Sequence, residues 1–104
     1  MNENAPQIPQ TGFYYHFKHD PEVSIDNYAY EVIGIARHTE TNELLVVYRP
    51  IYESTSLAPA DCSVRPLAMF MDTVDRGKGP TKRFTEITDE DIIVALEEIR
   101  DGRE

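Results

Sequence analysis

The sequence predicts a mainly β protein, namely a small SH3-like barrel of about five short strands followed by a C-terminal α-helix. Three observations lead to this prediction. Several short segments alternate apolar and polar residues, which is typical of half-buried strands. Two such segments within residues 30–52 flank a short polar turn, as in a β-hairpin. A helical apolar stripe occurs near the C-terminus. A half-open roll, or a β-sandwich fragment that is completed by dimerisation, is the alternative.

The length of 104 residues leaves room for one small domain. Residues 1–11 contain two prolines and few apolar side chains, and predict a flexible lead-in. Residues 12–87 hold the barrel-like strands. Residues 88–104 hold the acidic helix and tail.

The first predicted strand begins at Gly12 and places three aromatic residues on one face: Phe13, Tyr15 and Phe17. Residues 20–27 are polar and predict a loop. The second strand, residues 30–37, is apolar on both faces in its middle, and Gly34 is suited to a bulge or a bend. Its predicted faces are Tyr30, Val32, Gly34 and Ala36 on one side, and Glu31, Ile33, Ile35 and Arg37 on the other. Residues 38–42 predict a turn, after which residues 44–49 return as a β-branched strand before Pro50.

The second half of the chain predicts shorter elements. Residues 53–61 are rich in Ser, Ala and Pro and predict a loop, followed by a short strand at 62–65. The sequence PLAMF at 66–70 predicts a single helical turn, because proline suits the first helical position. Residues 72–82 contain two glycines and a proline and predict a loop, and residues 83–87 predict the last strand.

The C-terminal segment predicts an amphipathic helix with Thr88 as its N-cap and a stop near Gly102. Its apolar residues follow the spacing i, i+3, i+4, i+7: Ile92, Ala95, Leu96 and Ile99. A short helix with such a stripe needs a surface to pack on. The barrel flank is one candidate, and a second copy of the chain is the other, which predicts a homodimer through these four residues.

The net charge of −9 is concentrated in residues 86–104, where eight acids face two arginines. An acidic chain disfavours binding to nucleic acid through overall charge, although a local basic site remains compatible with it. The single cysteine and the absence of a signal sequence predict a cytoplasmic protein without a disulfide. No apolar run approaches the ~18 residues of a membrane span, so no membrane partner is expected.

Several blocks of the sequence match the pattern of a known family. The blocks are YYHFKH (14–19), YEVIGIARHTET (30–41), ELLVVYRPIY (43–52) and VRPLAMF (64–70), followed by RFTEI (83–87). In combination they resemble the bacterial family catalogued as domain of unknown function 1653, from Gly12 to about Ile87. The resemblance implies no assigned activity and mainly supports the extent of the domain.

The resemblance carries a set of polar, aromatic and proline positions over to this chain: His16, Lys18, Tyr30, His38, Glu40, Thr41, Tyr48, Arg49, Arg65 and Pro66. The chain departs from the family pattern at Tyr15, which replaces an arginine, and at Ser63, which replaces a usual tryptophan. The loops at 20–28 and 53–61 are longer than usual, and the helix at 89–101 lies outside the resemblance.

His16 and His38, with Glu40 beside the latter, are candidate bases or metal ligands, because imidazole titrates near neutral pH. The sequence contains neither an H-x-x-x-H nor a C-x-x-C ligand pair. We therefore predict no catalytic residue and no metal, and expect both imidazoles to bond to the backbone in turns. An enzyme or a metal-dependent accessory protein built on these three residues is the alternative.

Arg49 and Arg65 each precede a proline at the end of a predicted strand. Two neighbouring guanidinium groups suit a carboxylate or phosphate ligand. Ion pairing across the sheet is the structural alternative, with Glu31, Glu40 or Glu43 as partner.

One basic segment contains Arg76, Lys78, Lys82 and Arg83 around a G-x-G sequence. It lacks the strand-to-helix context of a phosphate-binding P-loop, so a solvated loop is expected and no nucleotide cofactor is predicted.

These patterns together predict a binding module without a cofactor, whose ligand is a peptide, a protein or a small anionic molecule. The predicted ligand-binding residues are Tyr48, Arg49, Arg65, His16, Lys18, His38 and Glu40. The two polar ends of the central hairpin are roughly 20 Å apart, so one small pocket holds only one of them unless the strand curls sharply. Of the two, we prefer the end with Tyr48 and Arg49, together with Arg65. A structural subunit that docks through the C-terminal helix is the further alternative.

Overall fold

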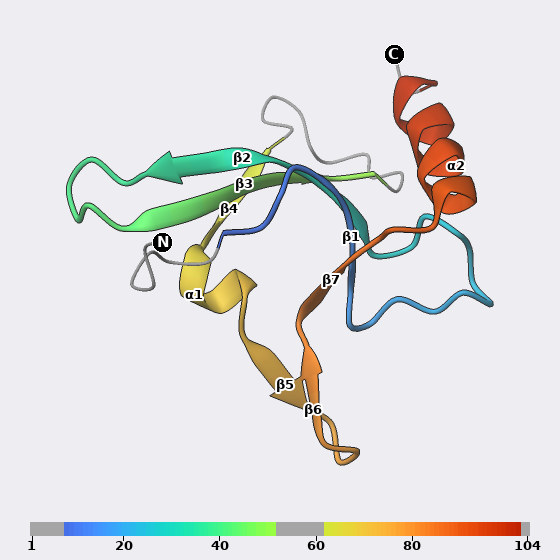
Figure 1. Ribbon diagram of the computed structural model, residues 1–104, viewed down its shortest axis with the longest axis horizontal. Helices are drawn as coiled ribbons and strands as arrows, with labels where there is room; N and C mark the ends of the chain where they lie inside the picture. Colours follow the sequence, from blue (N-terminus) through green and yellow to red (C-terminus); the bar gives the residue numbers. More distant parts are fainter. Residues whose placement is uncertain (1–7, 52–61, 103–104) are drawn as a thin grey trace, which may run out of the picture.

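The computed structural model describes residues 8–51 and 62–102. This part of the chain contains seven strands in two antiparallel sheets and two helices, which confirms a mainly β protein with a C-terminal helix (Figure 1). The elements in order are β1 (Gly12–His16), β2 (Ala29–Arg37), β3 (Leu44–Pro50), β4 (Ser63–Pro66), α1 (Leu67–Phe70), β5 (Thr73–Asp75), β6 (Pro80–Lys82), β7 (Phe84–Glu86) and α2 (Glu90–Asp101). Most of the predicted lead-in and the whole predicted loop at 53–61 lie outside the described residues.

The larger sheet has five strands in the order β4-β3-β2-β1-β7. Among the described residues no pairing joins β4 to β7, so the sheet is open and the predicted SH3-like barrel is not confirmed. β5 and β6 form a separate hairpin within residues 72–82, where the sequence predicted a loop. That prediction was wrong because these three-residue strands are largely exposed and carry no apolar alternation.

β2 and β3 form the predicted central hairpin, with Arg37 opposite Leu44 beside the turn. A bulge lies between Val32 and Gly34, as the glycine indicated. The bulge changes the predicted face of β2, because the residue opposite Val46 is Ile35. Ile35, rather than Gly34, therefore follows Val32 into the buried cluster on that face.

Apolar side chains are buried on both faces of the larger sheet. The α1 face carries Tyr14, Val32, Val46, Tyr48, Phe70 and Phe84. The α2 face carries Phe13, Ala29 and Ile51, which pack with Ile87 and Leu96. Neighbours Phe13 and Tyr14 fall into different clusters because successive side chains of a strand point to opposite faces. α1 with the β5–β6 hairpin and α2 thus occupy separate parts of the molecule (Figure 1).

α2 begins at Glu90 and has Asp89, rather than the predicted Thr88, as its N-cap. Gly102 is the C-cap, as predicted. Leu96 is fully buried, and Ile92 and Ile99 pack against the same cluster, so the apolar stripe lies on the chain's own sheet. A homodimer through this stripe requires α2 to leave that sheet, and it stays a prediction. Neither helix of the described residues is long and apolar enough to cross a membrane.

Candidate functional site

Arg65 and Tyr48 meet on the α1 face of the sheet. Arg65 lies opposite Val46 in the pairing of β3 with β4, and its Nε donates a hydrogen bond to the Tyr48 hydroxyl at 3.4 Å. The guanidinium carbon is 5.4 Å from the centre of the Phe84 ring, within the range of a cation–π interaction. Within the described residues Arg65 forms no ion pair with a carboxylate. An aromatic ring and a hydroxyl therefore hold this cation in place, and its capacity to pair with an anion is retained.

Arg49 lies on the opposite face, because it follows Tyr48 directly in β3. Its Nε and Nη2 donate to Oε1 of Glu31 at 3.1 and 2.9 Å, so the ion pair considered from the sequence is present. Oε2 of Glu31 accepts a hydrogen bond from Nη1 of Arg100 in α2 at 2.9 Å. Glu31 thus pairs with Arg49 within the sheet and with Arg100 of α2, and it connects the two elements. The structure does not bring Arg49 to Arg65.

His16 joins the Arg65 side of the sheet through aromatic contacts. Its ring centre is 5.1 Å from that of Phe84, with the two rings nearly perpendicular. It is 4.3 Å from the ring centre of Phe17 and 5.6 Å from that of Tyr28, which lies nearly parallel to it. Phe84 therefore contacts both His16 and Arg65, and the three residues form one continuous cluster with Tyr48.

His16 is uncharged at neutral pH. Burial lowers its pKa to about 4, and the nearby cations of Arg65, Lys18 and Arg83 act in the same direction. Nδ1 accepts a hydrogen bond from the backbone N–H of Lys18 at 3.2 Å, which confirms the expected backbone contact. With Nδ1 as the acceptor, the neutral ring carries its hydrogen on Nε2 and can donate it to a ligand.

The low pKa of His16 predicts a pH dependence of stability. In the unfolded chain this imidazole titrates near pH 6.5. Between about pH 4 and pH 6.5 the unfolded state therefore binds more protons than the folded state, and the free energy of unfolding rises with pH across this window. An NMR titration of the imidazole protons measures the pKa directly. His16→Gln identifies the resonance and should flatten the pH dependence, and His38→Gln is the control. A His16 pKa near 6.5 would contradict the prediction.

His38 and Glu40 lie in the β2–β3 turn. Nδ1 of His38 accepts hydrogen bonds from the backbone N–H groups of Glu40 and Thr41 at 3.1 and 3.3 Å, which confirms the expected backbone contact. His16 is next to the opposite end of β2, because its backbone N–H donates to the Tyr28 carbonyl, so the length of that strand, roughly 30 Å, lies between the two residues. The described residues contain no group of three side chains that could hold a metal ion. The structure therefore does not bring His16, His38 and Glu40 into one site.

Arg83 and Asp72 form an ion pair at the base of the β5–β6 hairpin. Nε of Arg83 donates to Oδ1 of Asp72 at 2.6 Å, and Nη2 donates to Oδ2 at 3.3 Å. The hydrogen bond from Arg83 lowers the pKa of the Asp72 carboxyl. This acid therefore neutralises Arg83, which leaves Arg65 and Lys18 as the nearby cations outside a described ion pair.

Sequence reasoning missed Phe17, Arg76 and Phe84 as parts of this surface. The guanidinium carbon of Arg76 is 5.2 Å from the centre of the Phe17 ring. Arg76 belongs to the β5–β6 hairpin, and no pattern in the sequence indicated that this hairpin approaches the end of β1. For Phe84 a signal was available, because it forms the R-F pair that belongs to the family resemblance.

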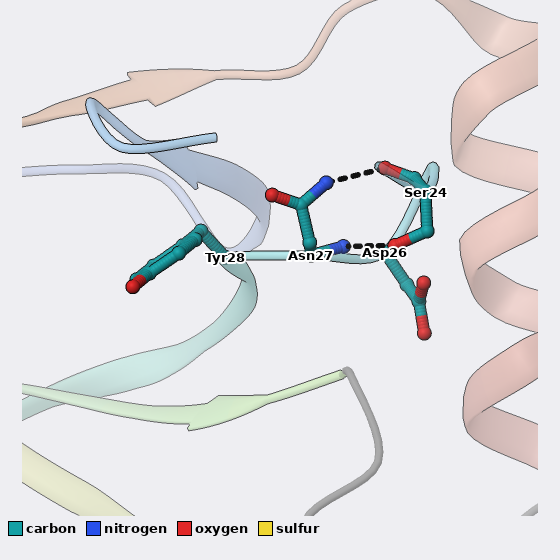
Figure 2. Close-up of a pocket in the computed structure, with 4 residues that line it drawn as sticks. All are labelled: Ser24, Asp26, Asn27 and Tyr28. Carbon is teal, nitrogen blue, oxygen red and sulfur yellow. Dashed lines mark hydrogen bonds between the residues drawn. The ribbon is translucent and has the colours of Figure 1, made fainter. Parts of the chain in front are cut away.

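An open pocket of about 360 Å³ adjoins the cluster and is lined by Ser24, Asp26, Asn27 and Tyr28 (Figure 2). The backbone N–H of Asn27 donates to Oγ of Ser24 at 3.1 Å, and its side-chain amide donates to the Ser24 carbonyl. Tyr28 has a φ of +53°, a conformation that large side chains rarely adopt. Its ring points away from Ser24 and Asp26 (Figure 2) and stacks on His16. Tyr28 thus links the pocket to the cluster.

The position of the family tryptophan also belongs to this face. Ser63 lies directly opposite Tyr48 in the pairing of β3 with β4 and is exposed. Residues directly opposite each other in antiparallel strands share a face, so a tryptophan there would lie beside Tyr48. The serine of this chain supplies much less apolar surface next to the site.

Comparisons with known proteins identify the family. No functionally curated protein matches the chain. Residues 12–86 match the model of a family described as "Protein of unknown function (DUF1653)". A solved protein of that family from Bordetella bronchiseptica is 35% identical, with a TM-score of 0.58; the match covers 77% of this chain and 92% of that chain. The resemblance in the sequence blocks is confirmed, and the chain belongs to the DUF1653 family.

Proposed function

We propose that this protein is a small cytoplasmic binding module that takes an anionic ligand on the α1 face, at Arg65, Tyr48 and His16. The observation that carries the proposal is the environment of Arg65. Its guanidinium group is fixed by the Phe84 ring and the Tyr48 hydroxyl, and no carboxylate of the described residues pairs with it. A half-buried guanidinium group in this state favours a carboxylate or a phosphate partner.

The other groups of the site support an anion. Lys18 is exposed and adds a second positive charge beside His16. The uncharged imidazole contributes a neutral donor at Nε2. The acidic α2 helix packs on the opposite face, so the sheet separates the acids of this helix from the site. The local charge is therefore positive although the chain as a whole is acidic.

The aromatic residues support a ligand that also has an apolar or planar part. Phe84 and Tyr48 are buried and form the floor, while His16 and Phe17 are partly exposed. Such a floor restricts the Arg65 side chain, which reduces the entropy that ligand binding costs. A small carboxylate, a phosphate-bearing molecule or an acidic peptide has the required charge.

Arg65→Ala tests the proposal. Titration of the full chain with sodium phosphate and with citrate, at constant ionic strength, should shift the NMR signals of His16, Lys18 and Arg65. The variant should weaken binding roughly 10- to 100-fold, because a hydrogen bond to a charged group is lost. Arg37→Ala is the matched control, since Arg37 is an exposed arginine beside the β2–β3 turn, where its guanidinium group donates to Asn42. Equal binding by wild type and Arg65→Ala would contradict the proposal.

A further inference from the structure

Two guanidinium groups flank a run of aromatic rings on the α1 face. Arg76 lies 5.2 Å from the ring centre of Phe17, and Phe17 lies 4.3 Å from the ring centre of His16. His16 lies 5.1 Å from the ring centre of Phe84, and Phe84 lies 5.4 Å from the guanidinium carbon of Arg65. The row therefore has a guanidinium group at each end and three rings between them.

The β5–β6 hairpin extends the positive charge beyond Arg76. Lys78 and Lys82 are exposed on the same hairpin. Oδ1 of Asp75 accepts a hydrogen bond from the backbone N–H of Gly77 at 2.8 Å, so this acid is part of the turn. The sequence predicted a solvated basic loop here, whereas the structure places its first arginine on an aromatic ring that belongs to the site.

Tyr28 adds an exposed ring next to the row. Its side chain is 39% exposed, and its ring is nearly parallel to that of His16. Asn27 fixes the preceding loop through hydrogen bonds with Asp20 and Ser24. Tyr28 also lines the pocket of Figure 2, together with Ser24, Asp26 and Asn27.

We propose that the anionic ligand is a single-stranded nucleic acid, and this inference rests on the proposed function. The two guanidinium groups suit phosphates, and the partly exposed rings of Phe17, His16 and Tyr28 suit bases, since every base has a π-face that stacks on an aromatic side chain. Phe84 is buried and stacked on Phe70, so it supports the row without meeting a base. An acidic peptide requires the cations but gives no reason for the partly exposed rings.

The negative charges near the row are few. Asp72 is paired with Arg83, and Asp75 belongs to the hairpin turn. Glu86 lies opposite Tyr14, two residues after Phe84 in β7 and on the same face of the sheet. The other described acids of the C-terminal segment, Asp89 to Asp101, belong to α2 and its N-cap on the other face. Asp26 lines the pocket beside Tyr28, so one acid that forms no ion pair among the described residues adjoins the row there, while the acids of α2 lie on the other face.

Fluorescence anisotropy with a labelled oligouridylate of about eight nucleotides tests the inference on the full chain. Arg76→Glu should weaken binding at least roughly tenfold and should make the slope of log K against log salt less steep by about 0.7, as one phosphate contact is lost. Arg37→Glu makes the same change of charge at the far end of β2 and should have little effect. Tyr28→Asn, which suits the positive φ, should weaken binding roughly tenfold.

The outcomes separate this inference from the proposed function. If phosphate or citrate binds at Arg65 and the oligonucleotide does not, the ligand class is wrong and the anion site stands. Equal affinity for a duplex of the same length, or for polyglutamate, would also overturn the single-strand inference, because neither presents unstacked bases. If none of these probes binds, both proposals fail. Folding of each variant is checked by circular dichroism and by its urea midpoint.

Discussion

Replacing Phe70 with alanine should lower the free energy of unfolding by about 3–5 kcal/mol. Phe70 is 1% exposed, and its ring lies parallel to that of Phe84 with the ring centres 4.2 Å apart. The Tyr14 ring meets the Phe70 ring edge-on, with the ring centres 5.6 Å apart, and the ring centre of Tyr48 is 6.0 Å from that of Phe70. Alanine leaves a cavity among these rings, which the rigid sheet fills only in part. For a domain whose total stability is of the order of 5–15 kcal/mol, this is a large fraction.

Met69→Ala is the matched control for Phe70→Ala. Met69 belongs to the same helical turn and is 48% exposed, so its replacement should change stability by less than about 1 kcal/mol. Urea unfolding of the two variants, followed by circular dichroism, measures the difference. A midpoint for Phe70→Ala that equals that of Met69→Ala would show that the α1 cluster does not form. Loss of Phe70 should also make the Phe84 ring more mobile, and the guanidinium group of Arg65 lies over that ring.

Replacing Leu96 with alanine should destabilise the protein by about 2–5 kcal/mol. Leu96 has no exposed surface and inserts from α2 between side chains that include Phe13 and Ile51. α2 contacts the sheet through this cluster and through the ion pair of Arg100 with Glu31. Because a helix of 12 residues is marginal in isolation, its folding depends on this packing.

Val94→Ala is the control on the same helix, since Val94 is 51% exposed and alanine is the better helix former. We expect it to be neutral or slightly stabilising. Amide hydrogen exchange gives a second measurement: Leu96→Ala should accelerate exchange along α2 much more than in β2 and β3. Protection of α2 that is unchanged in Leu96→Ala would contradict the intramolecular packing of the helix.

Most of the secondary structure could be predicted because its signals are local. The central hairpin follows from two β-branched segments around a polar turn, and Gly34 marked the bulge. The single helical turn was predicted in the right place, but it begins at Leu67, and Pro66 is its N-cap rather than its first helical residue. The backbone contacts of His16 and His38 were expected for the same reason, since their partners lie within three residues along the chain.

The composition of the candidate site was predicted only in part. Arg65 with Tyr48 and His16 were among the predicted residues, and the structure brings them together through Phe84. The separation of Tyr48 from Arg49 was available from the sequence, because adjacent residues of a strand face opposite ways. The prediction that placed Tyr48 and Arg49 in one binding site ignored this alternation. The ion pair of Arg49 with Glu31 is its structural consequence.

The sequence by itself determined the family, the mainly β character, the central hairpin and the amphipathic helix, because periodicity, turn residues and the family blocks are read along the chain. Only the tertiary structure decided which strands are neighbours, and thereby the site. β1 pairs with β7, whose residues are distant in the sequence, and this pairing sets His16 opposite Phe84. The β5–β6 hairpin then brings Arg76 to Phe17. Such contacts depend on the packing of both sheet faces, and no local pattern encodes them.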